Sequence, residues 1–388
     1  MKRPPIPTEA SFTSPARHEA LTARVGTWLG IAFGLCFLTG LISHWYYLYD
    51  APLTPPTRPV IGYRITQGVH VLSGIAAIPL LLVKLWSVYP KLFAAVPLGK
   101  ARDLVLHLLE RASIAVLVAA GIFQLVIGLA NYTQWYPWSF SFRPTHYAVA
   151  WIAIGALVVH IAVKLPIIRA AYAEKLPEPV VEETRETASY GGPSRRTILR
   201  TALLASGVAV LAAAGGTVPW LRKVSVFAVR TGEGPQGVPI NKSAEAAGVT
   251  TTAREAGFRI TFVNGDREQS LSRDQLTAMT QRTHDLPIAC VEGWSAAATW
   301  TGVRLSELLD LVDAPDDATM RVTSLQQGGA FGITEITSGF ARDPLTLLAL
   351  QLNGQDLSID HGFPCRLIAP NRPGVFQTKW VTRIEVVT

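Results

Sequence analysis

The sequence predicts a membrane-embedded α-helical bundle followed by an α+β globular domain. Hydrophobic residues make up 49% of the 388-residue chain, charged residues make up 16%, and the mean hydropathy is +0.27, all unusual for a water-soluble protein. The long apolar runs end before residue 221, whereas residues 221–388 alternate short apolar segments with turns. A chain of this length holds two or three domains, so these two sequence patterns predict two separate domains.

Four apolar runs are each long enough to cross a bilayer as a helix, since a span needs about 20 apolar residues. They cover residues 25–49, 65–89, 112–132 and 147–168. Only two of the runs contain a lysine, Lys84 or Lys164, and each lies near a run's end, where its amine can reach the interface. The runs predict a four-span bundle over residues 25–170, after an N-terminal tail at residues 1–24.

A fifth apolar run, residues 203–218, is shorter and rich in alanine and glycine, and it predicts a signal-anchor span over residues 197–220. It follows Ser194-Arg195-Arg196-Thr197-Ile198-Leu199-Arg200, which resembles a twin-arginine export signal with Ile198 in place of the usual phenylalanine. Such a signal is read by a receptor and exports folded proteins. The alternative is an ordinary basic flank of a span. The charged stretch before the run predicts a cytoplasmic linker over residues 171–196.

The distribution of Lys and Arg predicts the topology. These residues concentrate in the tail, in residues 91–111 and in residues 169–200, whereas the opposite loops hold only Arg58, Arg64 and Arg143. The positive-inside rule then places the N-terminus in the cytoplasm and the C-terminal domain outside the cell membrane. Because the net charge of +7 sorts by side of the membrane, we expect no nucleic-acid partner.

Four histidines lie in or at the ends of the apolar runs: His44, His70, His146 and His160. Ionisable residues in spans are functional candidates, and imidazole is a standard axial ligand of haem iron. His146 and His160 are separated by about 21 Å of helix rise. This spacing resembles the fourth helix of two-haem membrane cytochromes of the formate-dehydrogenase type, although their inner-haem ligand early in the first helix is missing here.

That resemblance implies an outer haem b on His70 with His146 or His44. The alternative is that the histidines form hydrogen bonds between helices of a passive, haem-free anchor.

The C-terminal region carries local signals of an α+β domain. Residues 258–263 alternate in polarity, Asn264-Gly265 predicts a hairpin turn, and residues 270–279 predict a short helix capped by Ser272. Further strands are expected at residues 321–324, 366–369 and 380–387.

The three cysteines, Cys36, Cys290 and Cys365, form no disulfide framework and no CxxC metal site. Cys36 and Cys365 have the surroundings of packed apolar residues. Cys290 begins the run Cys290-Val291-Glu292-Gly293-Trp294-Ser295, which resembles the C-x-E-x-W-S molybdenum-ligand loop of the sulfite-oxidase family. Residues 298–309, 361–370 and 379–384 resemble further blocks of that family in the same order.

The resemblance implies a sulfite-oxidase-type molybdopterin domain at residues 221–388. In it, Cys290 is the catalytic residue and supplies the thiolate ligand of molybdenum. The resemblance and the need of the pterin phosphate for basic partners assign five further residues to the cofactor. They are Arg366, Lys379, His284, His361 and Trp294.

These features predict a membrane-bound molybdenum oxidoreductase that transfers an oxygen atom and two electrons on the extracytoplasmic side. The reaction is either sulfoxide-type reduction or sulfite-type oxidation of a small molecule. Electrons pass between the metal and the quinone pool, or a redox partner, through the bundle, and the twin-arginine machinery exports the domain. Two alternatives are a molybdopterin enzyme on a passive, haem-free anchor, and a non-catalytic extracytoplasmic binding module, against which the intact Cys290 argues.

Overall fold

The structure, a computed structural model, describes residues 7–12, 14, 16–48, 53–173, 193–228 and 234–387. The chain forms two compact units. The first consists of Met1–Leu38 and His70–Ala213, and the second of Thr39–Val69 and Ala214–Thr388. The first unit is helical, whereas the second contains all the described β-strands.

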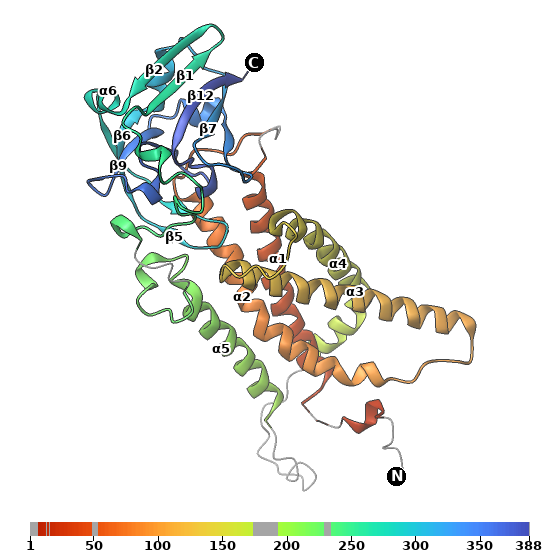
Figure 1. Cartoon of the computed structure of the whole chain (residues 1–388). Helices are drawn as coiled ribbons and strands as arrows, with labels where there is room; N and C mark the ends of the chain where they lie inside the picture. The colour runs from red at the N-terminus through yellow and green to blue at the C-terminus, as the bar shows by residue number, and fades with distance from the viewer. Residues whose placement is uncertain are drawn as a thin grey trace, which may run out of the picture. The chain divides into compact units, whose positions relative to one another are not determined.

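Five long helices make up most of the N-terminal region (Figure 1): α1 (Glu19–Trp45), α2 (Gly62–Val88), α3 (Ala101–Tyr132), α4 (Phe142–Ala173) and α5 (Arg195–Ala214). Within the described residues, these five are long and apolar enough to cross a membrane. Helices α3 and α4 extend beyond the predicted apolar runs because regular hydrogen bonding continues into polar residues at their ends. Within the region expected as the fifth span, residues 197–220, helix α5 ends at Ala214 and a separate 3-10 turn covers Pro219–Leu221.

Arg195 and Arg196 form the first turn of α5. Of the predicted cytoplasmic segments, residues 1–6 and 174–192 lie outside the described residues.

Small residues allow close packing of helices in the first unit. Ala32, Ala77 and Ala202 are buried together with Leu80. Two hydrogen bonds tie α5 to its neighbours: the Ser206 hydroxyl donates to the Ala76 carbonyl (2.9 Å), and the Tyr132 hydroxyl donates to the Ala213 carbonyl (2.9 Å). Small residues and interhelical hydrogen bonds are the usual means of packing helices in an apolar surrounding.

The second unit is an α+β fold built on two larger sheets and one hairpin (Figure 1). The first sheet has the order β2-β1-β12-β7-β8, and comprises β1 (Arg259–Asn264), β2 (Arg267–Ser272), β7 (Thr319–Ser324), β8 (Ile333–Ile336) and β12 (Val381–Val387). The second has the order β10-β9-β6-β3 with β11 paired to β9, and comprises β3 (Arg282–Asp285), β6 (Thr299–Arg304), β9 (Leu347–Leu352), β10 (Gln355–Asp356) and β11 (Arg366–Ile368). The hairpin pairs β4 (Ile288–Ala289) with β5 (Ser295–Ala296).

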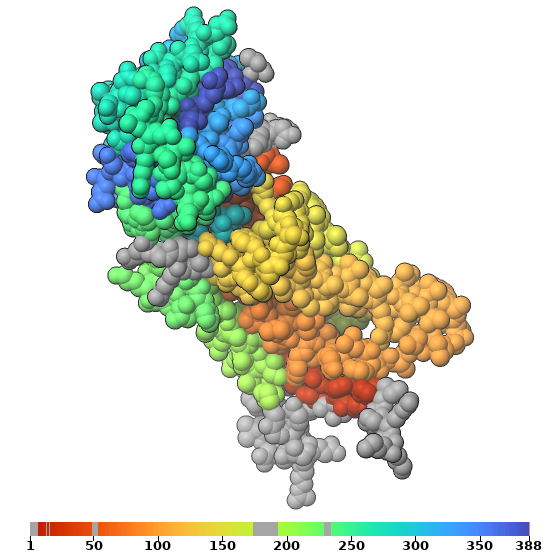
Figure 2. Space-filling view, viewed as in Figure 1, coloured from red at the N-terminus to blue at the C-terminus, as the bar shows by residue number. Residues whose placement is uncertain are grey.

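Three short helices, α6 (Arg273–Ala278), α7 (Leu305–Asp310) and α8 (Ser338–Ala341), accompany the sheets. Helices α6 and α7 and strands of both sheets bury one shared apolar core, which includes Ile260, Leu276, Leu308 and Leu367. In the space-filling view, the strand-rich region coloured from green to blue is a continuous, close-packed mass (Figure 2).

The local predictions for this unit are confirmed in most details. The turn between β1 and β2 contains Gly265 at a φ of 57°, a conformation that glycine adopts without strain. The Ser272 hydroxyl caps α6 by accepting a hydrogen bond from the Gln275 amide (3.2 Å). The helix begins later than expected, however, because residues 270–272 pair with β1 as part of β2.

Candidate functional site

Cys290 lies in the five-residue loop that closes the β4–β5 hairpin. Its amide donates to the Trp294 carbonyl (2.9 Å), and the Gly293 amide donates to the Cys290 carbonyl (3.0 Å). Gly293 has a φ of 88°, so glycine is required there for the tight loop. Cys290 is only 1% exposed and belongs to an apolar cluster with Trp294, Trp300 and Ile288. The motif is therefore folded as a rigid loop that fixes one buried sulfur atom.

The surroundings of Cys290 disfavour a thiolate unless a cation is bound there. Burial, followed by the neighbouring Glu292 carboxylate, raises the pKa of the Cys290 thiol well above its usual value. A coordinated metal ion reverses this effect, since it deprotonates a coordinating thiol. Glu292 Oε2 and Trp294 Nε1 are buried and have no hydrogen-bond partner among the described residues. The loop thus holds two buried polar groups that the part of the chain described by the structure does not satisfy.

Two buried cations lie beside this loop. Arg366, at the start of β11, and Lys379 face each other in an antiparallel bridge and are 2% and 7% exposed. Burial lowers the pKa of Arg366 to about 9 and lowers the pKa of Lys379 well below its usual value. Cys290 is near enough to interact electrostatically with both groups.

The hydrogen bonds of both cations go to backbone carbonyls. Arg366 donates to the carbonyls of Gln377 and His361 (both 3.2 Å). Lys379 donates to the carbonyls of Lys242 (2.8 Å) and Asp360 (2.7 Å). Neither forms a salt bridge with any carboxylate that the structure describes. Buried cations are normally paired, so this arrangement fits an anionic ligand.

His361 is a neutral hydrogen-bonding group beside the two cations. Its Nε2 donates to the Pro235 carbonyl (2.8 Å). Burial, followed by the charges of Arg366 and Lys379, lowers the pKa of His361 to about 4. The next residue, Gly362, has a φ of 111°, and a side chain there would meet the Lys379 backbone at 3.1 Å, so glycine permits the close approach of these two segments.

The structure brings Cys290, Trp294, Arg366, Lys379 and His361 into one region, but it gives His284 different charged neighbours. His284 lies on β3, and its Nε2 is buried without a partner among the described residues. Burial, and then Arg304, lowers its pKa, and Asp343 also lies nearby.

Trp300 was absent from the predicted site residues, yet its ring lies 5.2 Å from the Arg366 guanidinium carbon, a cation–π distance. The sequence did contain a signal for Trp300, because it lies in residues 298–309, the second block that resembles the sulfite-oxidase family.

In the first unit, His70 and His146 contact each other. Their ring centroids are 6.0 Å apart and the ring planes are nearly perpendicular, at 85°. His70 Nδ1 lies 2.7 Å from the Cys36 carbonyl, so this nitrogen is the donor and Nε2 is left for another partner. His146 Nδ1 is buried and has no partner among the described residues.

The other two histidines do not join this pair. His160 lies near Lys84, Lys164 and Glu110, the last two forming an ion pair. His44 falls within the second compact unit. His146, one of the two partners expected for His70, is the histidine whose ring is observed in contact with the His70 ring.

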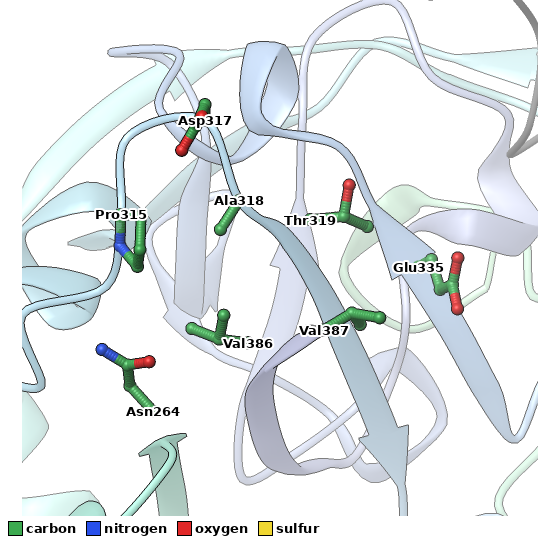
Figure 3. A pocket seen from close by; sticks show the side chains of 8 residues that line it. All are labelled: Asn264, Pro315, Asp317, Ala318, Thr319, Glu335, Val386 and Val387. Carbon is green, nitrogen blue, oxygen red and sulfur yellow. The ribbon is translucent and has the colours of Figure 1, made fainter.

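Figure 3 shows an open pocket of about 590 Å³ on the first sheet. Its lining includes Pro315, Asp317, Thr319 and Glu335, and it contains none of the predicted site residues. Asn264 at its edge is already bonded to the carbonyls of Val312 (3.0 Å) and Asp313 (2.9 Å). The lining of this pocket therefore includes no residue assigned to the Cys290 region.

Comparison with known proteins identifies the class of the C-terminal domain. Residues 246–388 match the family described as the oxidoreductase molybdopterin binding domain. YedZ1 of Azospira oryzae, whose name assigns it to a protein-methionine-sulfoxide reductase, is 34% identical over 113 residues, which are 29% of this chain and 42% of that protein. The catalytic subunit MsrP of the protein-methionine-sulfoxide reductase of Gluconobacter oxydans is 34% identical over 112 residues, 25% of this chain and 36% of MsrP.

A third relative is the mitochondrial sulfite oxidase of Drosophila melanogaster, 28% identical over 159 residues, 33% of this chain and 27% of that enzyme. The chain thus spans less than half the length of each of these relatives. It carries a molybdopterin oxidoreductase domain whose relatives include sulfite oxidases and methionine-sulfoxide reductase subunits.

Proposed function

We propose that this chain is a membrane-bound molybdenum oxidoreductase that transfers an oxygen atom to or from a small sulfoxide-type or sulfite-type substrate. The observation that carries the proposal is the buried Cys290 thiol beside two buried cations, Arg366 and Lys379, that form no salt bridge with a carboxylate among the described residues, although Asp360 lies near Lys379. A sulfur ligand next to buried positive charge fits a metal held by a phosphate-bearing pterin.

In this proposal each residue has one task. Cys290 would bind the metal as a thiolate, Arg366 and Lys379 would neutralise the phosphate of the pterin, His361 would form a hydrogen bond at the pterin, and the Trp294 indole N–H would donate one. His284, which has a buried nitrogen without a described partner, is assigned to the same cofactor. Bound molybdopterin supplies the two-electron redox chemistry and the exchangeable oxygen. The protein contributes a buried, water-poor site in which electrostatic interactions are strong.

The five apolar helices are proposed to cross the cell membrane, with the C-terminal domain outside. The excess of Lys and Arg in the tail and in the segments between the helices on one side supports this orientation. Arg195 and Arg196 are proposed to direct the cofactor-loaded domain to the twin-arginine export machinery.

His70 and His146 are proposed to bind a haem b that exchanges electrons with the quinone pool. The two imidazoles would hold the haem iron, and the haem would supply one-electron chemistry. The observed separation of 6.0 Å supports this pairing, as does the hydrogen bond between His70 and the Cys36 carbonyl, which orients the ring. His160, near the middle of α4 and 14 residues after His146, is too far along the helix to bind the same iron.

The proposal is tested with the full chain, purified in detergent from a host that makes molybdopterin. We expect stoichiometric molybdenum, a b-type haem spectrum, and reduction of a sulfoxide or oxidation of sulfite with an artificial electron carrier. Active protein that contains molybdenum but no haem would support the passive-anchor alternative. Protein without molybdenum, from a host that loads a control molybdenum enzyme, would contradict the proposal.

A further inference from the structure

Residues 39–69, which join the first two long helices, belong to the same compact unit as the Cys290 domain. They are anchored to that domain at two points away from the Cys290 loop. Arg58 forms a two-pronged salt bridge with Asp343 (2.9 and 3.2 Å). The Asn371 side chain accepts from the Tyr63 amide (2.5 Å) and donates to the Tyr46 hydroxyl (2.8 Å) and the Pro56 carbonyl (2.7 Å).

The anchoring at Asn371 requires a glycine. A Cβ atom added to Gly62 would lie 2.9 Å from Asn371 Oδ1, so any other residue must displace the Asn371 side chain. Asn371 is 4% exposed and has the left-handed φ of 52°, which asparagine tolerates better than most residues. The chain thus contains a specific joint between the start of α2 and the C-terminal domain.

Beyond this joint, the first turns of α2 contact both sides of Cys290. Tyr63, 1% exposed, packs in one cluster with Ala289, the residue before Cys290. Gln67, 6% exposed, donates from its Nε2 to the carbonyl of Val291, the residue after Cys290 (3.0 Å). Val60 packs against the apolar cluster that contains Cys290 itself. Three residues of one short segment therefore cover the loop.

We propose that the first turns of α2 form one wall of the Cys290 site, and that Gln67 is a positioning residue that holds the Cys290 loop through Val291. Because the loop and Gln67 are both buried, this hydrogen bond limits local opening and keeps the sulfur in one place. The effect of this positioning on molybdenum coordination rests on the proposed function. The positioning itself concerns residues that are present with or without the cofactor.

The test uses the full chain with Gln67→Met, which keeps the length of the side chain and removes its donor. The matched control is Thr66→Ala, because within the described residues the Thr66 hydroxyl donates its hydrogen bond to the Tyr63 carbonyl of its own helix (3.1 Å). The first readout is the rate at which a small maleimide labels Cys290 in cofactor-free protein, followed on the peptide that contains it. We expect labelling on the order of tenfold faster in Gln67→Met and unchanged in Thr66→Ala.

The second readout uses cofactor-loaded protein. We expect Gln67→Met to change the electron paramagnetic resonance spectrum of the one-electron-reduced molybdenum and to lower the metal content, with Thr66→Ala matching the wild type. Labelling rates and spectra within experimental error of the wild type in Gln67→Met would overturn the inference. If Gln67→Met does not fold, Gln67→Leu, which also removes the donor to the Val291 carbonyl, provides the same comparison and the same criterion.

The two readouts separate this inference from the proposed function. If wild-type protein holds no molybdenum, the proposed function fails, while the labelling rate still decides whether Gln67 holds the loop. If wild-type protein is loaded and active but Gln67→Met is unchanged in both readouts, only the positioning role of Gln67 fails.

Discussion

Arg366 and Lys379 face each other across an antiparallel bridge. Both are buried, and among the described residues both donate hydrogen bonds only to backbone carbonyls. Two like charges held together away from water destabilise a protein unless a bound anion compensates them. The bridge therefore links stability to cofactor occupancy, and this link can be measured without an activity assay.

Replacement of Lys379 by methionine is expected to have opposite effects on the cofactor-free and the cofactor-loaded protein. Removal of one buried charge should stabilise the cofactor-free domain by about 1–3 kcal/mol, because the desolvation cost and the repulsion from Arg366 disappear. The same change should lower the pterin content of protein made in a competent host. Thermal unfolding and pterin fluorescence measure the two effects. The control is Arg383→Met, which alters a partly exposed salt bridge with Glu385.

An unchanged pterin content in Lys379→Met would show that Lys379 does not bind the cofactor. A loss of stability in the cofactor-free form would show that its charge is compensated within the protein.

Acid is expected to destabilise the cofactor-free domain through His361. Its pKa is lowered to about 4 in the folded state, whereas an unfolded histidine titrates near 6.5, so the unfolded state binds more protons between these values. Stability should therefore fall as the pH decreases from 6.5 to 4, by at most about 3.4 kcal/mol. His361→Gln should flatten this part of the curve of unfolding midpoint against pH. A curve of equal slope in both proteins would assign the acid sensitivity to other groups.

The haem prediction separates three histidines. His70→Ala and His146→Ala should each remove the b-type absorbance from the reduced-minus-oxidised spectrum, because a low-spin haem needs both axial ligands. His160→Ala should retain that absorbance, since His160 lies near Glu110 and the two lysines instead. Turnover with an artificial soluble carrier should persist in all three variants, because this route bypasses the bundle. Equal loss of haem in His160→Ala would contradict the assigned pair.

Export is expected to depend on the identity of the arginine pair and not on its charge. Arg195→Lys combined with Arg196→Lys keeps the charge that orients a span but removes the receptor signal. Residues 221–388 should then stay in the cytoplasm, as judged by protection from an external protease. Unchanged protease access in the double variant would show that the arginine pair is an ordinary basic flank of a span and not an export signal.

The sequence predicted features that are set by local interactions. The Gly265 turn and the Ser272 cap depend on residues within a few positions of each other, and the structure confirms both. The Cys290 loop was identified by a run of adjacent residues, and its hairpin geometry follows from Ile288–Ala289 pairing with Ser295–Ala296. The end of α5 at Ala214 could not be read from the hydrophobic pattern, because the pattern continues beyond Ala214 without a continuing helix.

Features that join distant parts of the chain could not be predicted in this way. Gln67 and Val291 are 224 positions apart, and Tyr63 and Asn371 are 308 positions apart, and neither pair has a sequence pattern that signals contact. The contact between His70 and His146 likewise depends on the packing of helices. His284 shows the same limit, since its position on a strand did not reveal that its charged neighbours are Arg304 and Asp343.

The central claim is that the Cys290 sulfur binds molybdenum. X-ray absorption at the molybdenum edge measures the number of sulfur ligands directly, in full-length wild-type protein and in Cys290→Ser purified in parallel. Coordination by the two sulfurs of one pterin and by Cys290 predicts three molybdenum–sulfur bonds in the wild type and two in the variant, with loss of turnover because an oxygen replaces the soft ligand. The same number of sulfur ligands in both proteins, or no molybdenum in the wild type, would contradict the account.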